Sequence, residues 1–454
     1  MVDSDLHCSF HTHLVLFGAL AITISAVMAC SCGGVSSNSA TQSGVTVTIS
    51  PSKVSLAIGG TQQFTDQVTG SSNTAVTWSV NGGDGGNSTF GTISSSGLYT
   101  APSTVSPGTV TVSVSSQEDS SKQASALVTV RLQVLAVAAS PAQGMSASDA
   151  LSLVRSAGAR GQGVDLHWPA MEPSPGVYDF TEANQIDMIQ LQGPFQIHVT
   201  LGVINTTVRQ VPADLASAPF DSAQFETRFE NMLTAFLNQF GSKIDSIAIG
   251  NEVDVYLGAN PTEWSAYANF YGKMAALVRT LDPSIKVGVT TTFGGATDTQ
   301  TGPLVAGLNA VSDLFMMNYY AVNSNFTPRD PSVVAGDFTR ILAASPVKPI
   351  LLHEVGFPTS TALGSSEQLQ AQFVTNVFSA WMNAGDKIQF LSFFLLHDDT
   401  PQACQVIANQ LGISDPNFVA FFCSLGLRNS DGTDKLGWTA LKTEAQADGF
   451  TAQP

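Results

Sequence analysis

Two glutamates, Glu252 and Glu354, stand directly after runs of apolar residues. The first run reads IAIGNE and the second PILLHE. Because carboxylates are unfavourable to bury, either each strand simply ends at the surface or a site needs these groups. Two carboxyl groups that face each other can play two different roles in one reaction. One of them, protonated, gives a proton to a leaving oxygen, and the other, ionised, attacks carbon.

The elements that would position these glutamates lie between residues 133 and 450, where short apolar runs alternate with longer amphipathic segments. The runs are VLAVAAS, GVDLHW, FQIHVTLGVI, IDSIAIGNE, KVGVTTT, LFMMNYYAV, PILLHEVGF and IQFLSFFLLHDD. The helical candidates include 146–158, 225–240, 263–281 and 367–385. This alternation predicts a parallel (β/α)8 TIM barrel. A doubly wound open sheet is the alternative, disfavoured because no Gly-rich phosphate loop follows the first run.

In such a barrel, active sites form where the strands end, so the polar residues that close the runs are the candidates. They are Asp165, His167, Trp168, Asn205, Asn251, Glu252, Asn318, Tyr319, Tyr320, Glu354, His397, Asp398 and Asp399. Strands four and seven stand opposite each other. Glu252 and Glu354 can therefore approach to about 5 Å, the separation in retaining glycosidases, whereas about 6.5–9.5 Å would indicate inversion.

Alternation along a strand predicts which side chains face inward. Ala248 and Gly250 are expected to point inward with Glu252. His353 precedes Glu354 and is expected to point the other way, as a packed or supporting histidine. No spacing of His, Cys and Asp indicates a metal site, so no cofactor is expected.

The Asn-Glu that closes the fourth run and the Glu that closes the seventh resemble clan A of the retaining glycoside hydrolases, which includes β-mannanases, β-1,4-galactanases, β-1,3-glucanases and cellulases. WPAMEPSPGVYDF and HEVGFPTS strengthen the resemblance, which covers the C-terminal domain in order and spacing. It implies hydrolysis of a β-linked poly- or oligosaccharide by double displacement. Glu252 would be the acid/base, Glu354 the nucleophile and Asn251 the ligand of the sugar 2-OH. Tyr319 or Tyr320 would bond the nucleophile, with Tyr320 preferred.

This chain departs from the clan in two places. The eighth run lacks the Trp that often forms the floor of the sugar site, so Phe394 or a loop would replace it. An Arg often found near strand two is absent, and His167 lies there instead.

Other residues near the rim have two interpretations each. His167 and Trp168 either contact sugar or support the loop. Asn205 is a candidate sugar ligand. Asp398 and Asp399 either grip sugar hydroxyls or cap the following loop, and we expect one of them, Asp398, to bind sugar. Three further tryptophans lie in helical patterns and are expected to pack between helix and barrel: Trp264, Trp381 and Trp438.

Residues 45–132 have a different character. VTVTI, TAVTWSV, TVTVSV and ALVTV alternate apolar and polar residues, which predicts an antiparallel β-sandwich with Trp78 in its core. The segment resembles the bacterial immunoglobulin-like domains (group 2) of surface proteins. That resemblance implies a spacer or an adhesion unit.

The N-terminus predicts export. An apolar run, Leu14–Ala29, ends in VMAC, the pattern of a lipoprotein signal that occupies residues 1–30 and makes Cys30 the lipidated residue. The first 13 residues contain no Lys or Arg, which leaves an uncleaved anchor or a misassigned start as alternatives. A flexible linker, 31–44, follows. Cys404 and Cys423 are then predicted to form a disulfide, the alternative being two buried thiols.

Charge limits the partners. The 454 residues carry a net charge of −17, with a pI near 4.6 and no run of Lys or Arg. Such a balance argues against nucleic acid and anionic membranes, apart from a lipid anchor, and favours a neutral partner such as carbohydrate. The prediction is a monomeric glycosidase of the cell envelope or medium. Its rivals are a surface protein that binds glycan without cleaving it and a scaffold with a decayed site.

Overall fold

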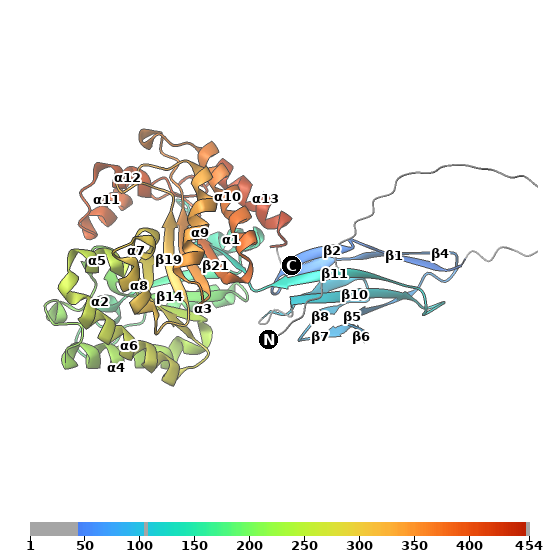
Figure 1. The fold of residues 1–454 in the computed structure, drawn as a ribbon, viewed down its shortest axis with the longest axis horizontal. Coiled ribbons are helices and arrows are strands. Elements are labelled where there is room, and N and C mark those ends of the chain that lie inside the picture. Colours follow the sequence, from blue (N-terminus) through green and yellow to red (C-terminus); the bar gives the residue numbers. More distant parts are fainter. Residues whose placement is uncertain (1–43, 104–107, 451–454) are drawn as a thin grey trace, which may run out of the picture. The chain divides into compact units, whose positions relative to one another are not determined.

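The computed structural model describes residues 44–103 and 108–450. The predicted signal segment, the lipidation site Cys30 and residues 31–43 of the linker lie outside the described residues. In Figure 1 the described chain forms a group of strands and a ring of strands surrounded by helices. Within the described residues, no helix is long and apolar enough to cross a membrane.

The first group of strands forms three small sheets, ordered β1-β4, β2-β11-β10-β5-β6 and β3-β9-β8-β7. The strands are β1 Thr46–Ser50, β2 Lys53–Ala57, β3 Thr61–Gln63, β4 Thr65–Thr69, β5 Val76–Val80, β6 Gly83–Asp84, β7 Gly86–Asn87, β8 Gly91–Ile93, β9 Leu98–Thr100, β10 Gly108–Ser116 and β11 Gln123–Arg131. All paired strands run antiparallel, as predicted, except β2 and β11, which pair in parallel. Trp78 is buried against Phe64, which confirms its core position.

The second group is a ring of parallel strands. They are β12 Val134–Val137, β13 Gly161–His167, β14 Gln196–Asn205, β16 Ser246–Asn251, β17 Lys286–Gly288, β18 Thr290–Thr292, β19 Phe315–Tyr320, β20 Ile350–Gly356 and β21 Ile388–Phe393. The fifth predicted strand is broken at Val289. Its first half, β17, pairs with β16 and its second half, β18, pairs with β19, so this strand closes the ring. The predicted barrel is therefore confirmed, and the open sheet is excluded.

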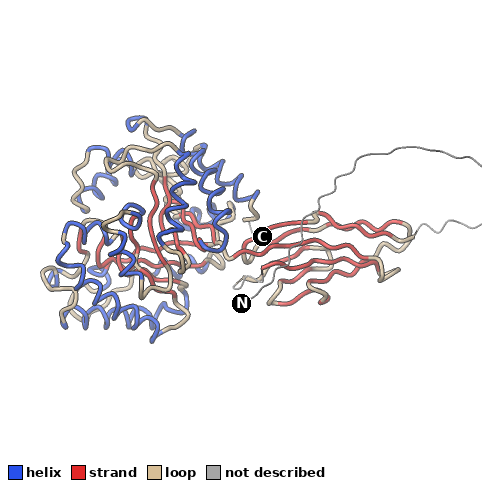
Figure 2. The backbone as a smooth tube through the Cα atoms, in the orientation of Figure 1, coloured by secondary structure: helices blue, strands red, loops and turns tan. Residues whose placement is uncertain are grey.

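Helices surround this ring of strands and also lie in the loops that follow the strands (Figure 2). They are α1 Ala147–Ser156, α2 Trp168–Met171, α3 Asn184–Leu191, α4 Ala223–Phe240, α5 Val253–Ala259, α6 Trp264–Leu281, α7 Phe293–Thr297, α8 Gly302–Asn309, α9 Val334–Ala344, α10 Glu367–Ala384, α11 Pro401–Gln410, α12 Pro416–Phe422 and α13 Leu436–Ala447. Serine side chains cap the start of two long helices: Ser222 accepts from the amide of Phe225 in α4, and Ser366 from that of Leu369 in α10.

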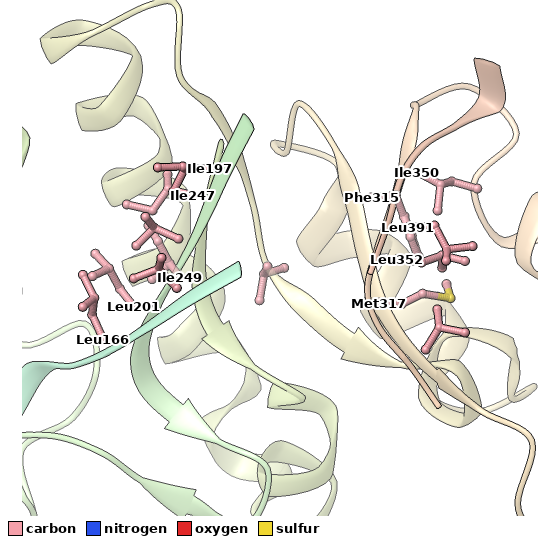
Figure 3. Close-up of a cluster of buried hydrophobic side chains, with 14 of the residues drawn as sticks. Leu166, Ile197, Leu201, Ile247, Ile249, Phe315, Met317, Ile350, Leu352 and Leu391 are labelled. Atoms are coloured by element: carbon pink, nitrogen blue, oxygen red, sulfur yellow. The ribbon is translucent and has the colours of Figure 1, made fainter. Parts of the chain in front are cut away.

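Alternate strand residues build two layers. One set faces the helices, and Figure 3 shows ten labelled members of it on the strands at two sides of the ring. The other set faces the interior of the barrel and includes Ala136, Ala248, Met316, Leu351 and Phe390. The predicted helix-packing tryptophans are buried as expected: Trp264, Trp381 and Trp438. The strand ends thus stand on a packed core, which fixes the residues that follow them.

Candidate active site

Asn251 and Glu252 enter the same cavity although they are consecutive residues. A regular strand would send them to opposite faces. Glu252 has a left-handed backbone, with φ 48° and ψ 41°, and Gly250 has φ 93°. A Cβ on Gly250 would lie 2.8 Å from the hydroxyl of Tyr267 in the outer helix α6, so the expected inward direction of Gly250 is wrong. These two positive φ values turn both functional side chains inward.

Glu252 accepts hydrogen bonds from the turn that follows β14 and from β19. Thr206 donates from Oγ1 to Oε2 at 2.9 Å, and Asn318 donates from Nδ2 to Oε1 at 3.1 Å. Thr206 occupies a two-residue turn between β14 and β15 (Val208–Arg209), and its amide bonds the carbonyl of Asn251. Asn251 in turn donates to Oδ1 of Asn205 at 3.3 Å. The carboxyl is therefore oriented by groups from strands on both sides.

Glu354 lies across from this group and accepts a hydrogen bond of 2.5 Å from the hydroxyl of Tyr320. Tyr319 points the other way. It is buried, and its hydroxyl donates to Asp337 at 3.0 Å in the helical layer. Strand alternation decides between the two tyrosines, so Tyr320 belongs to the cavity and the alternative of Tyr319 is wrong.

His353 is buried as expected, but it does not point away from Glu354. Its Nε2 lies 3.7 Å from Asp165 and its ring meets that of His198 at 4.9 Å inside the barrel. The pairing of β20 with its neighbours shifts register at this point, so a bulge sends both residues inward. Gly163 provides the space, since a Cβ there would lie 3.4 Å from the histidine ring.

The cavity above these strand ends has a volume of about 350 Å³. Part of its lining is polar and comes from strands two, three, four, six and seven and from the residues that follow them: Asp165, His167, Thr200, Asn205, Thr206, Gln210, Asn251, Glu252, Tyr320 and Glu354. The rest is apolar. Six of those side chains, which we call the apolar wall, come from α11, α12 and the turn between them: Ile407, Leu411, Ile413, Phe418, Phe421 and Phe422. Phe394, the expected replacement for the missing Trp, also lines it.

The two glutamates hold protons more firmly than free carboxyls do. Burial raises the pKa of Glu252, the charge of Asp254 adds to the rise, and the bonds from Asn318 and Thr206 oppose it. Burial raises the pKa of Glu354 well above its ordinary value, and the charge of Glu252 raises it further. Because each charge disfavours the other, the pair takes up one proton more readily than two separate carboxyls would.

Tyr320 remains a hydrogen-bond donor. Burial raises the pKa of its hydroxyl well above the ordinary value, and the neighbouring Glu354 adds to the rise. The donors around Glu354 lower the pKa of that carboxyl: they are Tyr320 and Asn318. Asn318 therefore lowers the pKa of both carboxyls, which links the two halves of the site.

Two predicted sugar ligands lie elsewhere. Trp168 is buried at the start of α2, where Nε1 donates to Glu172 at 2.9 Å and the ring packs on Phe225 and Phe229, so it supports the loop. Asp398 pairs with Lys435 at 2.6 Å and accepts from the amide of Gly426. It is not among the residues that line the cavity. Of the two interpretations of Trp168 the structure favours loop support, and it does not bring Asp398 into the cavity, where it was expected to bind sugar.

His167 does line the cavity. Its side chain is partly exposed, and Nδ1 lies 3.3 Å from Glu182. The ring can both meet a ligand and keep its orientation through the carboxylate.

The sequence analysis missed two features of the site and did not foresee the position of a third residue, Asn318. Thr206 gave no signal, because the tight turn that aims it was not foreseen. Asn318 was visible as the polar residue that closes the sixth run, but only the ring places it between the glutamates. The apolar wall had a signal that was not used: residues 401–423 carry apolar residues at helical spacing between two cysteines.

Cys404 and Cys423 are bonded in the structure, and the disulfide ties α11 to the residue after α12. Within the described residues, no group of three or more His, Cys, Asp or Glu side chains is placed to hold a metal ion.

Comparison with known proteins supports the fold of the N-terminal group of strands and the fold of the barrel. Residues 45–128 match the family of bacterial Ig-like domains (group 2). No curated protein matches the chain.

The barrel resembles solved structures at low identity. An exo-β-1,4-mannosidase from Opitutaceae bacterium strain TAV5 is 19% identical with a TM-score of 0.56, the match covering 70% of this chain and 60% of that one. A GH5_18 variant from Bifidobacterium longum subsp. longum ATCC 55813, in complex with Manβ1-4GlcNAc, is 16% identical, with a TM-score of 0.55 and coverage of 71% and 80%. Native xylanase 10B from Thermotoga maritima is 11% identical, with a TM-score of 0.51 and coverage of 70% and 96%. At such identity the likeness establishes the fold.

Proposed function

We propose that this protein is a retaining glycoside hydrolase that cleaves a β-linked sugar by double displacement. The observation that carries the proposal is the pair of partly buried glutamates, Glu252 and Glu354, at the ends of opposite barrel strands, each held by its own hydroxyl donor. The solved structures that share the barrel include a mannosidase and a xylanase, which is consistent with this chemistry.

Glu252 acts as the acid/base. It gives its proton to the glycosidic oxygen while Glu354 attacks the anomeric carbon, and a glycosyl ester forms. Glu252 then takes a proton from water, which attacks the ester and releases the sugar with its original anomeric configuration. The amide of Asn251 is available to the sugar 2-OH, where a hydrogen bond can strengthen in the transition state.

The first step needs Glu354 ionised and Glu252 protonated. Hydrogen bonds from Tyr320 and Asn318 favour the ionised form of Glu354. The charges of Glu252 and Asp165 oppose it, and together with burial they raise the pKa of Glu354 well above its ordinary value. Protonation of Glu252 removes the larger of the opposing charges. A single proton on Glu252 is therefore the arrangement from which catalysis starts.

The experiment is a comparison of Glu354→Ala, Glu252→Gln and the parent protein on β-linked polysaccharides and aryl β-glycosides. Each substitution should lower kcat by about 10²-fold or more on substrates with poor leaving groups. Glu252→Gln should lose much less on aryl glycosides with acidic phenols, because those leaving groups need no proton. A loss under about tenfold in Glu354→Ala on every substrate would contradict the assignment.

Export, a lipid anchor at Cys30, action as a monomer and a domain division at residues 132/133 belong to the same proposal. The Ig-like segment would then hold the barrel away from its attachment point, as the sequence resemblance implies. Mass spectrometry of the mature N-terminus tests the anchor, since a chain that still carries residues 1–29 would exclude lipidation at Cys30.

A further inference from the structure

The apolar wall covers a large part of a cavity that also contains two glutamates, and this combination limits the substrate. None of its six side chains carries a hydrogen-bonding group, and three of them, Ile407, Leu411 and Ile413, are aliphatic. Sugar hydroxyls pressed against such a surface would lose water without gaining partners. An aromatic ring can stack on the flat face of a sugar, but an aliphatic surface gives no comparable match.

The apolar wall is attached to both sides of the cavity. On one side, Thr207 donates a hydrogen bond from its side chain to the carbonyl of Leu411. On the other, the edge of Phe421 meets the ring of Tyr320 at 5.3 Å, and Asn417 donates to the carbonyl of Asn325 at 2.9 Å. The disulfide links α11 to the residue that follows α12. The cavity is thus enclosed by a built surface.

Several members of the apolar wall are incompletely covered. Ile407, Leu411, Ile413 and Phe422 are only partly buried although they face the cavity. A cavity of about 350 Å³ lies near the lower end of the roughly 300–1,000 Å³ typical of small-molecule sites. It therefore suits a small ligand that can cover this apolar surface.

Geometry indicates which part of the substrate is apolar. In the proposed reaction the leaving group departs beside the proton donor, Glu252. Thr206, which bonds Glu252, is followed in the chain by Thr207, which holds Leu411. The aliphatic end of the apolar wall therefore lies next to the leaving-group side, while the polar half of the cavity can bind the sugar.

We propose, on the basis of the function proposed above, that the substrate is a small β-glycoside whose leaving group is an apolar aryl or alkyl alcohol. The bond from Glu354 to the anomeric carbon forms as the bond to the alcohol oxygen breaks, and that oxygen takes the proton of Glu252. Water then cleaves the glycosyl ester. The products are the free sugar and the alcohol.

The test compares methyl and octyl β-glycosides of glucose, mannose, galactose and xylose, below micellar concentrations, with the β-1,4-linked disaccharide of each sugar. Each methylene group that is buried against the apolar wall should raise kcat/KM about fourfold. With three or more of them buried, kcat/KM for the octyl glycoside of the accepted sugar should exceed that of its methyl glycoside by at least about 60-fold. It should also exceed that of the disaccharide.

A matched pair of variants on the same segment sharpens the test. Leu411→Ser should lower the octyl-to-methyl ratio about fivefold to tenfold. Val406→Ser, at a side chain that is 53% exposed and outside the cavity lining, should leave the ratio unchanged. An octyl-to-methyl ratio near one in the parent protein, or a preference for the disaccharide, would overturn the inference.

A binding measurement separates this inference from the proposed hydrolysis. Octyl and methyl 1-thio-β-glycosides of the same sugars resist cleavage, and calorimetry reports their affinity directly. Tight binding of an octyl thioglycoside without cleavage of any glycoside would reject hydrolysis and retain the apolar subsite. Cleavage of methyl glycosides and disaccharides without octyl preference would retain hydrolysis and reject the apolar subsite. Neither binding nor cleavage would reject both.

Discussion

The hydroxyl of Tyr320 donates a 2.5 Å hydrogen bond to Oε2 of Glu354, whereas the hydroxyl of the adjacent Tyr319 bonds Asp337 in the helical layer. The two tyrosines therefore form a natural pair for experiment. They have the same side chain, both hydroxyls contact a carboxylate, and only one of those carboxylates lies in the cavity.

Tyr320→Phe should lower kcat by about 10²-fold and move the acidic limb of the pH–rate profile to higher pH. Glu354 must be ionised to attack. Loss of a donor that favours the ionised form raises the pKa of that carboxyl further, so activity begins at a higher pH. The measurement is kcat/KM on an aryl β-glycoside from pH 4 to 9.

Tyr319→Phe serves as the control. It should reduce the free energy of unfolding by about 1–3 kcal/mol, because a buried charge-assisted hydrogen bond is lost, and leave the pH profile in place. A shift of the acidic limb in Tyr319→Phe equal to that in Tyr320→Phe would contradict the assignment of the two hydroxyls.

Thr206→Val tests the other carboxyl. Thr206 donates to Oε2 of Glu252, and that bond lowers the pKa of the group. Since Glu252 must start protonated, loss of the bond should move the basic limb of the profile to higher pH. The loss of kcat should be less than about tenfold, because the variant keeps the proton donor. A basic limb that stays in place or moves to lower pH would contradict this role of Thr206.

Glu354→Gln should make the folded protein more stable at neutral and alkaline pH. Burial and the charge of Glu252 raise the pKa of Glu354 in the folded state above its unfolded value of about 4.3. The carboxyl therefore contributes most to stability when protonated, and this contribution is lost as the pH rises through the raised pKa. The uncharged amide in Glu354→Gln does not titrate, so its contribution to stability does not fall over that pH range.

Calorimetric Tm values from pH 4 to 8 measure this effect. The variant should melt about 2 °C or more above the parent protein at pH 8, with the gain shrinking toward pH 4. Asp187→Asn, at a carboxyl outside the cavity that pairs with Lys243, is a control that should show no such gain. A Glu354→Gln variant less stable than the parent protein at pH 8 would contradict the prediction.

Removal of the disulfide should loosen the apolar wall before it affects the barrel. Cys404 and Cys423 are separated by 19 residues, and a loop of this size is stabilised by about 3 kcal/mol when it is closed. In Cys404→Ser/Cys423→Ser, amide hydrogen exchange should rise across residues 401–423 and stay unchanged in β16 and β20. Equal protection of 401–423 in both proteins would show that packing alone holds the segment.

The sequence by itself determined the barrel. Its eight apolar runs alternate with helices, and a ring of strands inside a helical layer buries both faces of each run. Residues such as Ile247 and Leu352 pack against that helical layer, as the two-residue period of a strand requires. It also identified Glu252 and Glu354, because carboxylates that end buried strands are rare enough to stand out. The Ig-like sandwich followed from alternation of the same kind around Trp78.

The tertiary structure decided the features of the site that the two-residue period of a strand does not predict. A positive φ at Gly250 and Glu252 and a bulge beside His353 break the strand alternation, so Asn251 and Glu252 both face the cavity, and His353 and Glu354 both point into the barrel. Contacts between strands brought Asn318 to both glutamates. Contacts between distant segments placed Trp168 and Asp398 outside the cavity and set the apolar wall over it. The local sequence pattern predicts which face of a strand or helix a side chain occupies. Packing between segments that are distant in the sequence decides which residues lie opposite that side chain.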